Sequence, residues 1–406
     1  MPIGWQNKES NIRERTYRLL PVCAYGRIYE AYETYEKRRT LFLSGLLALA
    51  LVGCAGGGTE LPTTAADSES GSSTTTAATT AKPTEPDTPK DPWHYGMWND
   101  VKIREVTIDS GKGGDPVTVI QLTDLHIGTC TAEDLKNSTL KSTFENRKWG
   151  ANGAFVPNAK ASLDYADSQN ADRIVITGDA IDYLSEGSMN LLKETVWDRY
   201  RDGDGKVSRV LIALGNHERE QKMEGRVDEI YTLEEREQMV KEKWEHDILY
   251  TAVVVKDQVM VIQMDNGTGS FRNEQVPLLR ADLALAREKG YTVLLFFHEP
   301  ISTGNPKDRD VNASYVGKGA GTSFNFYTGS TVANPFTDPD STNGAIYRMI
   351  VNSADVVGGV FCGHLHADYY TEIQAKTPDG QAKVIPQYVL TGTPYDKGHA
   401  LKITVQ

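Results

Sequence analysis

The chain of 406 residues contains little cysteine, which limits the ways in which its fold can be held together. Its four cysteines, Cys23, Cys54, Cys130 and Cys362, are too few and too scattered for a disulfide-rich scaffold or a thiolate zinc finger. We expect Cys130 and Cys362 to be small buried residues and not a disulfide pair. Any bound metal must therefore rely on histidine, aspartate and asparagine side chains.

The chain also lacks an excess of positive charge. It has 43 lysines and arginines against 55 aspartates and glutamates, which gives a net charge of −12. This balance disfavours nucleic acids and anionic lipid headgroups as electrostatic partners, so no nucleic-acid partner is expected. The hydrophobic share of 39% and the 36 glycines are typical of a soluble globular protein and not of a fibrous or disordered one.

The apolar run from Leu41 to Val52 is too short to span a membrane. Its 12 residues fall short of the roughly 20 that a membrane-spanning helix needs. Basic residues 37–39 precede the run and small residues follow it, which indicates a secretory signal peptide over residues 1–53. The segment Leu51-Val52-Gly53-Cys54 resembles the lipobox of bacterial lipoproteins. This resemblance implies that Cys54 is acylated and becomes the new N-terminus.

Two segments beside this run are not expected to form a packed core. Residues 1–36 mix charges with several tyrosines, which signal peptides do not normally carry, so we predict no structure for this extension. Residues 54–92 consist mainly of threonine, alanine, serine, glycine and proline and cannot bury enough surface to offset their chain entropy. They are interpreted as a disordered tether that follows the lipidated cysteine. The protein would then be extracytoplasmic and anchored to the bacterial cell membrane.

Residues 93–406 have the pattern of a single α/β domain. Short apolar runs, typical of buried strands, occur at 117–122, 173–176, 210–214, 292–297 and 356–361. A hairpin is expected at 252–264, and further strands at 384–405. The pattern fits one mixed sheet, or two sheets packed face to face with helices outside.

Three helices have clear end signals. Thr232 and Glu235 form a capping box, which predicts a helix that ends near His246. A second helix is expected at 274–289, because Gly290 can terminate it, and a third at 344–352. Between them, residues 301–342 form a long segment rich in glycine, asparagine, serine and threonine. A loop of that length in a compact domain is usually functional.

Five segments place metal-ligating side chains at the ends of predicted strands, where they emerge at the carboxyl edge of a sheet. These segments are Thr123-Asp124-Leu125-His126, Gly178-Asp179-Ala180-Ile181-Asp182, Gly215-Asn216-His217-Glu218, His298-Glu299 and Gly363-His364-Leu365-His366. Each alone has an ordinary explanation as a turn or a hydrogen-bonded histidine. Together they supply carboxylate, imidazole and amide ligands that suit Mn, Fe or Zn.

The five segments, in this order, closely resemble the calcineurin-like metallophosphoesterase family. The resemblance implies a sandwich of two mixed β-sheets flanked by α-helices, with a site for two divalent metal ions. One metal is expected to bind Asp124, His126, Asp179 and His366. The other is expected to bind Asp179, Asn216, His298 and His364, so that Asp179 bridges.

The resemblance also implies roles for residues that do not bind metal. His217 is expected to contact the phosphoryl group as a general acid or a charge stabiliser, and Asp182 to orient a ligating imidazole. Glu218 and Glu299 could act in the same way or be carboxylates at the rim. Purple acid phosphatases carry a ligating tyrosine where this chain has Asp182, and Tyr183 is displaced by one residue, so a purple centre is not expected.

The expected activity is hydrolysis of a phosphate ester by in-line attack of a hydroxide held by the two metals. One alternative is a phosphodiesterase acting on a lipid, polymer or nucleotide diester. Another is a non-catalytic lipoprotein that binds a phosphorylated ligand. A non-catalytic binding protein would be expected to have lost some of the metal-ligating residues, and no such loss is visible in this sequence. Neither the substrate nor the oligomeric state follows from the sequence.

Overall fold

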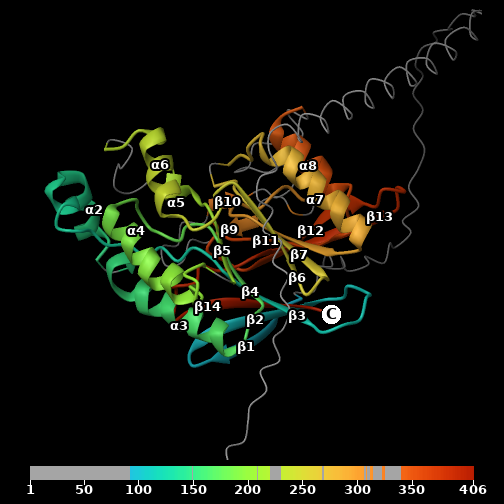
Figure 1. Ribbon diagram of the computed structural model, residues 1–406, viewed down its shortest axis with the longest axis horizontal. Helices are drawn as coiled ribbons and strands as arrows, with labels where there is room; N and C mark the ends of the chain where they lie inside the picture. The colour runs from blue at the N-terminus through green and yellow to red at the C-terminus, as the bar shows by residue number, and fades with distance from the viewer. Residues whose placement is uncertain are drawn as a thin grey trace, which may run out of the picture. The chain divides into compact units, whose positions relative to one another are not determined.

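In the computed structural model, two six-stranded β-sheets form the framework of the protein (Figure 1). In the first sheet the strand order is β1 (His94–Trp98), β2 (Val101–Ile108), β14 (His399–Val405), β3 (Val117–Leu122), β4 (Arg173–Thr177) and β5 (Val210–Ala213). In the second sheet it is β12 (Tyr369–Lys376), β13 (Ala382–Val389), β11 (Val357–Cys362), β8 (Thr292–Phe296), β7 (Val259–Met264) and β6 (Tyr250–Val255). Both sheets are mixed, because each contains parallel and antiparallel pairs.

The described part of the chain is the folded portion that follows the predicted tether. The structure describes residues 92–148, 150–207, 209–219, 230–267, 269–305, 308, 311–313, 322–324 and 340–406. All of them belong to one compact unit of the chain. The predicted signal peptide, Cys54 and the tether up to residue 91 lie outside the described residues.

Helices cover the outer face of each sheet (Figure 1). Around the first sheet are α2 (Ser138–Asn146), α3 (Phe155–Ser168), α4 (Glu186–Leu192), α5 (Asn216–Arg219) and α6 (Leu233–Lys243). Around the second are α7 (Gln275–Lys289) and α8 (Thr342–Val351). The predicted sandwich of two mixed sheets with helices outside is thus confirmed.

Three apolar layers hold the sandwich together. Val119 and Val117 of β3 face the second sheet, whereas Ile120 and Leu122 of the same strand face α3 and α4. The strands of the second sheet alternate in the same way between the middle layer and the layer under α7 and α8. The central strands are therefore largely apolar on both faces, with single buried polar residues such as Gln121 and Gln263. Fully burying one such side chain contributes roughly 1.5–3 kcal/mol relative to leaving it exposed.

Most of the predicted elements are found within one or two residues of their expected ends. The capping box of α6 is present, and Gly290 ends α7 in the left-handed conformation with a φ of 72°. The prediction that the helix from Thr232 ends near His246 was wrong. It ends at Lys243, because Trp244 is extended and its indole nitrogen donates to the carbonyl oxygen of Ile212 at 3.3 Å.

The segment 301–342 is described only in part. It contains a short antiparallel pair of strands, β9 (Val311–Ala313) and β10 (Thr322–Phe324), and its last residue, Thr342, begins α8. The two cysteines of the described part are free; Cys362 is buried and Cys130 is partly exposed.

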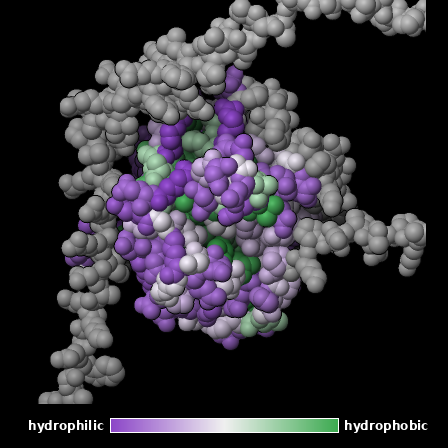
Figure 2. Space-filling view, turned by 90° about the vertical axis from the view of Figure 1, so that its right-hand side faces the viewer, coloured by the Kyte–Doolittle hydropathy of each residue, from purple (hydrophilic) through white to green (hydrophobic). Residues whose placement is uncertain are grey.

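The described surface is mainly polar. Figure 2 shows mostly hydrophilic residues on the face that it presents, with a few apolar residues between them. The large apolar side chains that are exposed are Tyr95, Met97, Leu233 and Val384. None of the helices in the described ranges has both the length and the apolar character that a membrane crossing requires.

Candidate metal centre

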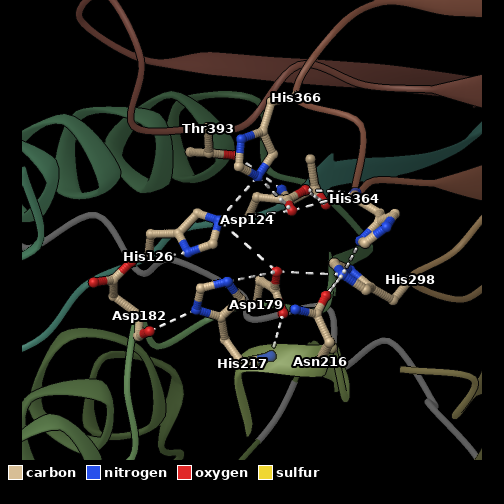
Figure 3. Close-up of polar contacts among 12 residues, drawn as sticks. Asp124, His126, Asp179, Asp182, Asn216, His217, His298, His364, His366 and Thr393 are labelled. Atoms are coloured by element: carbon tan, nitrogen blue, oxygen red, sulfur yellow. Dashed lines mark hydrogen bonds and ion pairs between the residues drawn. The ribbon is translucent and has the colours of Figure 1, made fainter. Parts of the chain in front are cut away.

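The predicted ligands meet where the strands of both sheets end (Figure 3). Asp124 and His126 follow β3, Asp179 follows β4, Asn216 follows β5, His298 follows β8, and His364 and His366 follow β11. The strands β3, β4 and β5 are parallel, as are β8 and β11. Their carboxyl ends therefore deliver side chains from distant parts of the chain to one place.

Asp124, His126, Asp179 and His366 form the first cluster. One ligand atom of each lies within 4.8 Å of those of the other three. The Nε2 atoms of His126 and His366 are 3.0 Å apart, and the latter is 3.1 Å from Asp124 Oδ1. All four residues are buried or nearly so, which makes the group a closed set of nitrogen and carboxylate ligands.

Asp179, His298 and His364 form a second cluster of the same kind. His298 Nε2 is 3.3 Å from Asp179 Oδ2 and 3.2 Å from His364 Nδ1. The Oδ1 atom of Asn216 lies 3.1 Å from the same His298 nitrogen. The structure thus brings together all seven residues that the sequence analysis proposed as ligands, and Asp179 belongs to both clusters.

The ligand atoms of these clusters fit divalent cations. Two pairs of ring nitrogens face each other, His126 with His366 and His298 with His364, at 3.0 and 3.2 Å. Imidazole nitrogens arranged in this way present lone pairs toward a shared position. Imidazole, carboxylate and amide ligands are the donors that Mn, Fe and Zn accept.

The backbone is sharply turned at most of the proposed ligands. Asp124, His126, Asp179, His364 and His366 all have φ values between 45° and 69°, in the left-handed region. Residues other than glycine rarely adopt this conformation, which costs on the order of 1–3 kcal/mol each and is concentrated at functional sites. The turns redirect each chain segment after its strand and so aim the side chains inward.

Two glycines make room for these turns. A Cβ atom at Gly215 would lie 2.1 Å from the Oδ1 atom of Asp179, and one at Gly363 would lie 1.8 Å from the hydroxyl of Thr123. Any other residue at either position would displace a proposed ligand or its neighbour. The glycines of these sequence segments are therefore required by close packing.

The centre carries fixed negative charge. Burial alone would raise the pKa of Asp124, but the positive potential of His366 and His298 lowers it to about 2. Burial would likewise raise the pKa of Asp179, yet His298 and His217 hold it well below its usual value. Both carboxylates are thus ionised at neutral pH and favour a bound cation.

His217 lies beside the clusters, and one of its two ring nitrogens makes a hydrogen bond to the backbone. Its Nδ1 atom donates to the backbone carbonyl of Asp182 at 2.5 Å, and its Nε2 atom is 3.8 Å from Asp179 Oδ2. Burial lowers the pKa of His217, but the negative charges of Asp179 and Asp182 outweigh it and raise the pKa. The raised pKa extends the pH range over which His217 is protonated.

Asp182 contacts the imidazole of a proposed ligand, as the sequence analysis expected. Its Oδ1 atom is 3.3 Å from His126 Nδ1. The guanidinium of Arg147 bonds both carboxylate oxygens of Asp182, and its Nε donates at 2.5 Å. Arg147 could not be identified from the sequence, because a single arginine after a helix carries no local signal.

The two glutamates whose roles the sequence left open are both buried. Glu218 accepts hydrogen bonds from the backbone amides of Gly215, Ile181 and Asp179 at 2.7, 3.0 and 3.2 Å. Burial and the charge of Asp179 raise its pKa to about 7. Glu218 thus joins the turn of Asp179 to the turn of Asn216. Glu299 is 5% exposed, so neither residue is a carboxylate at the rim.

Two further residues touch the ligand segments and were not found from the sequence. The hydroxyl of Tyr395 lies 2.9 Å from His366 Nδ1, and the side chain of Asn266 bonds the backbone amide of His298 at 3.0 Å.

Tyr183 is fully buried, and its hydroxyl lies 4.0 Å from Cys130 Sγ.

A family model described as calcineurin-like phosphoesterase matches residues 117–368, which is more than half of the chain. No curated protein matches the sequence significantly.

Several solved structures match with low similarity. A dimetal phosphatase from Danio rerio is 12% identical, with 68% of this chain and 88% of that chain covered and a TM-score of 0.38. The purple acid phosphatase PPD1 from yellow lupin seeds is 13% identical, with 75% and 46% covered and a TM-score of 0.35. The calcineurin-like phosphoesterase YfkN from Bacillus subtilis is 12% identical, with 68% and 81% covered and a TM-score of 0.30.

Proposed function

The chain belongs to the calcineurin-like phosphoesterase family, and we propose that it hydrolyses a phosphate ester at a centre of two divalent metal ions. The observation that carries this proposal is the position of Asp179, whose carboxylate belongs to both ligand clusters. A carboxylate shared in this way suits two cations held side by side.

The proposed ligands of one metal are Asp124, His126, Asp179 and His366, and those of the other are Asp179, Asn216, His298 and His364. When bound, the cations would lower the pKa of a water molecule and offset the charge that develops on the attacking and leaving oxygens. Mn, Fe and Zn all suit these ligands.

The remaining chemistry is assigned to His217. Its Nδ1 is held by the carbonyl of Asp182, so its Nε2 is the atom that faces the clusters. Because the neighbouring carboxylates raise its pKa, His217 favours the protonated form that can give a proton to the leaving oxygen. Asp182 contacts Nδ1 of His126, and Arg147 in turn donates a hydrogen bond to the carboxylate of Asp182. Both residues therefore help to fix the ring of His126.

The test is an assay of the full chain with added Mn²⁺ against nitrophenyl phosphate and bis-nitrophenyl phosphate. We expect hydrolysis that stops with a chelator and returns with Mn²⁺. Preference for the second substrate would identify a phosphodiesterase. Binding of Mn²⁺ and phosphate without turnover of either ester would overturn the proposal in favour of a non-catalytic binding protein.

We also propose that the enzyme is exported and held at the outer face of the bacterial cell membrane through a lipid on Cys54. The support for this comes from the lipobox-like segment 51–54 and the apolar run before it. Cys54 lies outside the described residues.

A further inference from the structure

We propose that Tyr395 and Asn266 are positioning residues, each of which supports one ligand histidine at one of the two metal positions. Tyr395 supports His366 in the first cluster, and Asn266 supports His298 in the second. The inference rests on the proposed dinuclear site and goes beyond it, because neither residue belongs to the five ligand segments.

Tyr395 acts directly on the imidazole ring of His366. Its hydroxyl is 2.9 Å from Nδ1, while Nε2 of the same ring is 3.1 Å from Asp124 Oδ1 and 3.0 Å from His126 Nε2. A hydrogen bond at one ring nitrogen fixes both the rotation of the ring and the nitrogen that is left for a metal.

The ring of Tyr395 is itself held by packing. Phe155 meets it edge to face, with the ring centroids 5.4 Å apart. On another side lies Gly392, where a Cβ atom would come within 2.6 Å of the tyrosine ring. The hydroxyl therefore has little freedom to leave His366.

The segment that carries Tyr395, residues 390–399, is fastened to the first sheet. Thr393 and Thr123 exchange two hydrogen bonds, both of 2.8 Å, and Asn158 donates to the carbonyl of Pro394 at 2.6 Å. Thr393 is labelled in Figure 3. Thr123 directly precedes the proposed ligand Asp124. The two hydrogen bonds between Thr393 and Thr123 thus link the segment that supports His366 to the segment that carries Asp124.

Asn266 acts on the backbone that carries His298. Its Oδ1 atom accepts hydrogen bonds from the amides of His298 and Glu299, both at 3.0 Å, and its Nδ2 atom donates to the carbonyl of Glu299 at 2.7 Å. The side chain is completely buried. Three hydrogen bonds from one amide therefore fix the turn at which His298 leaves β8.

The turn that contains Asn266 also touches the segment of the ligand Asn216. A Cβ atom at Gly267 would lie 2.5 Å from the backbone of Gly215. Asp265 forms an ion pair of 2.8 Å with Arg219, and both side chains are 1% exposed. Residues 265–267 thus support two ligands of the second cluster, His298 and Asn216.

The test measures Mn²⁺ binding to the full chain by calorimetry, without substrate. Tyr395→Phe removes one hydroxyl and keeps the packed ring, and Asn266→Ala removes the three hydrogen bonds. We expect each change to weaken one of the two Mn²⁺ positions by about 10- to 100-fold, as is usual for partners of metal ligands. Tyr165→Phe is the matched control. Its buried hydroxyl has no hydrogen-bond partner in the described part of the chain, so Mn²⁺ binding should be unchanged.

Ligand variants assign each effect to a position. The His364→Ala variant should retain only the first metal position, and the His366→Ala variant should retain only the second. Tyr395→Phe should weaken Mn²⁺ binding in the His364→Ala background and have no effect in the His366→Ala background, because its target is then missing. Asn266→Ala should show the reverse. A purely structural role would weaken binding in both backgrounds.

Equal effects of each change in both backgrounds, or no effect in either, would overturn the inference, as would a wild-type chain that binds no Mn²⁺. Unfolding temperatures measured in a chelator identify any variant that is unfolded. Tyr395→Phe keeps the test decisive if Asn266→Ala fails to fold. Because binding is measured without substrate, failure of the proposed hydrolysis is a separate result.

Discussion

His217 differs from the neighbouring histidines in its exposure and in the use of its ring. Its side chain is 22% exposed, against 3% for His126 and none for His298. The bond from Nδ1 to the carbonyl of Asp182 leaves Nε2 as the ring nitrogen on the side of Asp179, 3.8 Å from its Oδ2 atom. A ring held in this way can meet a substrate oxygen while its neighbours bind metal.

If His217 protonates the leaving oxygen, its loss should affect poor leaving groups most. An alkoxide needs a proton to depart, whereas a nitrophenolate does not. His217→Ala should therefore lose about 10²- to 10⁴-fold in kcat/KM on an alkyl phosphate and much less on a nitrophenyl phosphate, with metal content retained. Equal losses on both esters would favour charge stabilisation of the phosphoryl group. Loss of metal would show that His217 is a ligand.

Asp179 is the residue on which both proposed metal positions depend. Asp179→Asn removes the shared negative charge, so we expect Mn²⁺ binding to fall at both positions. Because the metal ions supply several kcal/mol of charge stabilisation, activity should fall at least about 100-fold. Metal analysis gives the readout, with Asn216→Ala as the comparison variant that should empty one position only. Two full equivalents of Mn²⁺ in Asp179→Asn would exclude the bridging role.

The strands that carry the proposed ligands could be predicted from the sequence, because each is a short apolar run that ends in a polar turn. The same local pattern marked the five segments that contain the seven proposed ligands, His217 and Asp182, and the resemblance to the family implied the role of each residue. The supports of these ligands could not be predicted, because Tyr395, Asn266 and Arg147 lie in irregular segments and act on residues distant in the chain. The bounds of α3 were also missed, since many of its buried residues are small, such as Ala159 and Ser162.

A buried network joins β2 and β14 to the loop that follows the ligand His366. Arg104 of β2 bonds His399 Nδ1 at 2.7 Å and forms an ion pair with Asp368, which accepts two further hydrogen bonds from Thr391. His399 Nε2 donates to Asp396 at 3.2 Å. His399 must be neutral here, because its Nδ1 accepts a hydrogen bond from the guanidinium of Arg104 and so carries no proton of its own.

This network predicts a loss of stability at acid pH. Burial, together with the charge of Arg104, lowers the pKa of His399 from 6.5 to about 4, although Asp396 and Asp368 oppose the shift. Between these values the unfolded chain takes up a proton that the folded protein does not. The contribution of His399 to stability is therefore complete above pH 6.5 and falls by about 3 kcal/mol as the pH drops to 4.

Urea unfolding of the wild type and of His399→Gln at several pH values checks this prediction. The difference in unfolding free energy between the two proteins should shrink as the pH falls from 6.5 to 4. Parallel pH dependences would contradict it.

The chain as a whole carries too much negative charge to bind a membrane through electrostatic attraction. Its net charge of −12 repels anionic headgroups. The anchor that we propose is instead a covalent lipid on Cys54, as the lipobox-like segment 51–54 implies. Each buried methylene contributes about 0.8 kcal/mol, and stable anchoring needs two acyl chains or a second signal.

Lipidation at Cys54 can be tested in cells that make the full chain in the presence of an alkyne-tagged fatty acid. The wild type should carry the tag and sediment with membranes, because acyl chains on Cys54 would supply the apolar area that the charged surface does not. Cys54→Ala should lose the tag completely. Cys23→Ala is the matched control, since Cys23 lies within the predicted signal peptide and should leave tag and sedimentation unchanged. Since an uncleaved signal peptide could also hold a chain at the membrane, incorporation of the tag decides the result. A Cys54→Ala chain that still carries the fatty acid would place the anchor elsewhere.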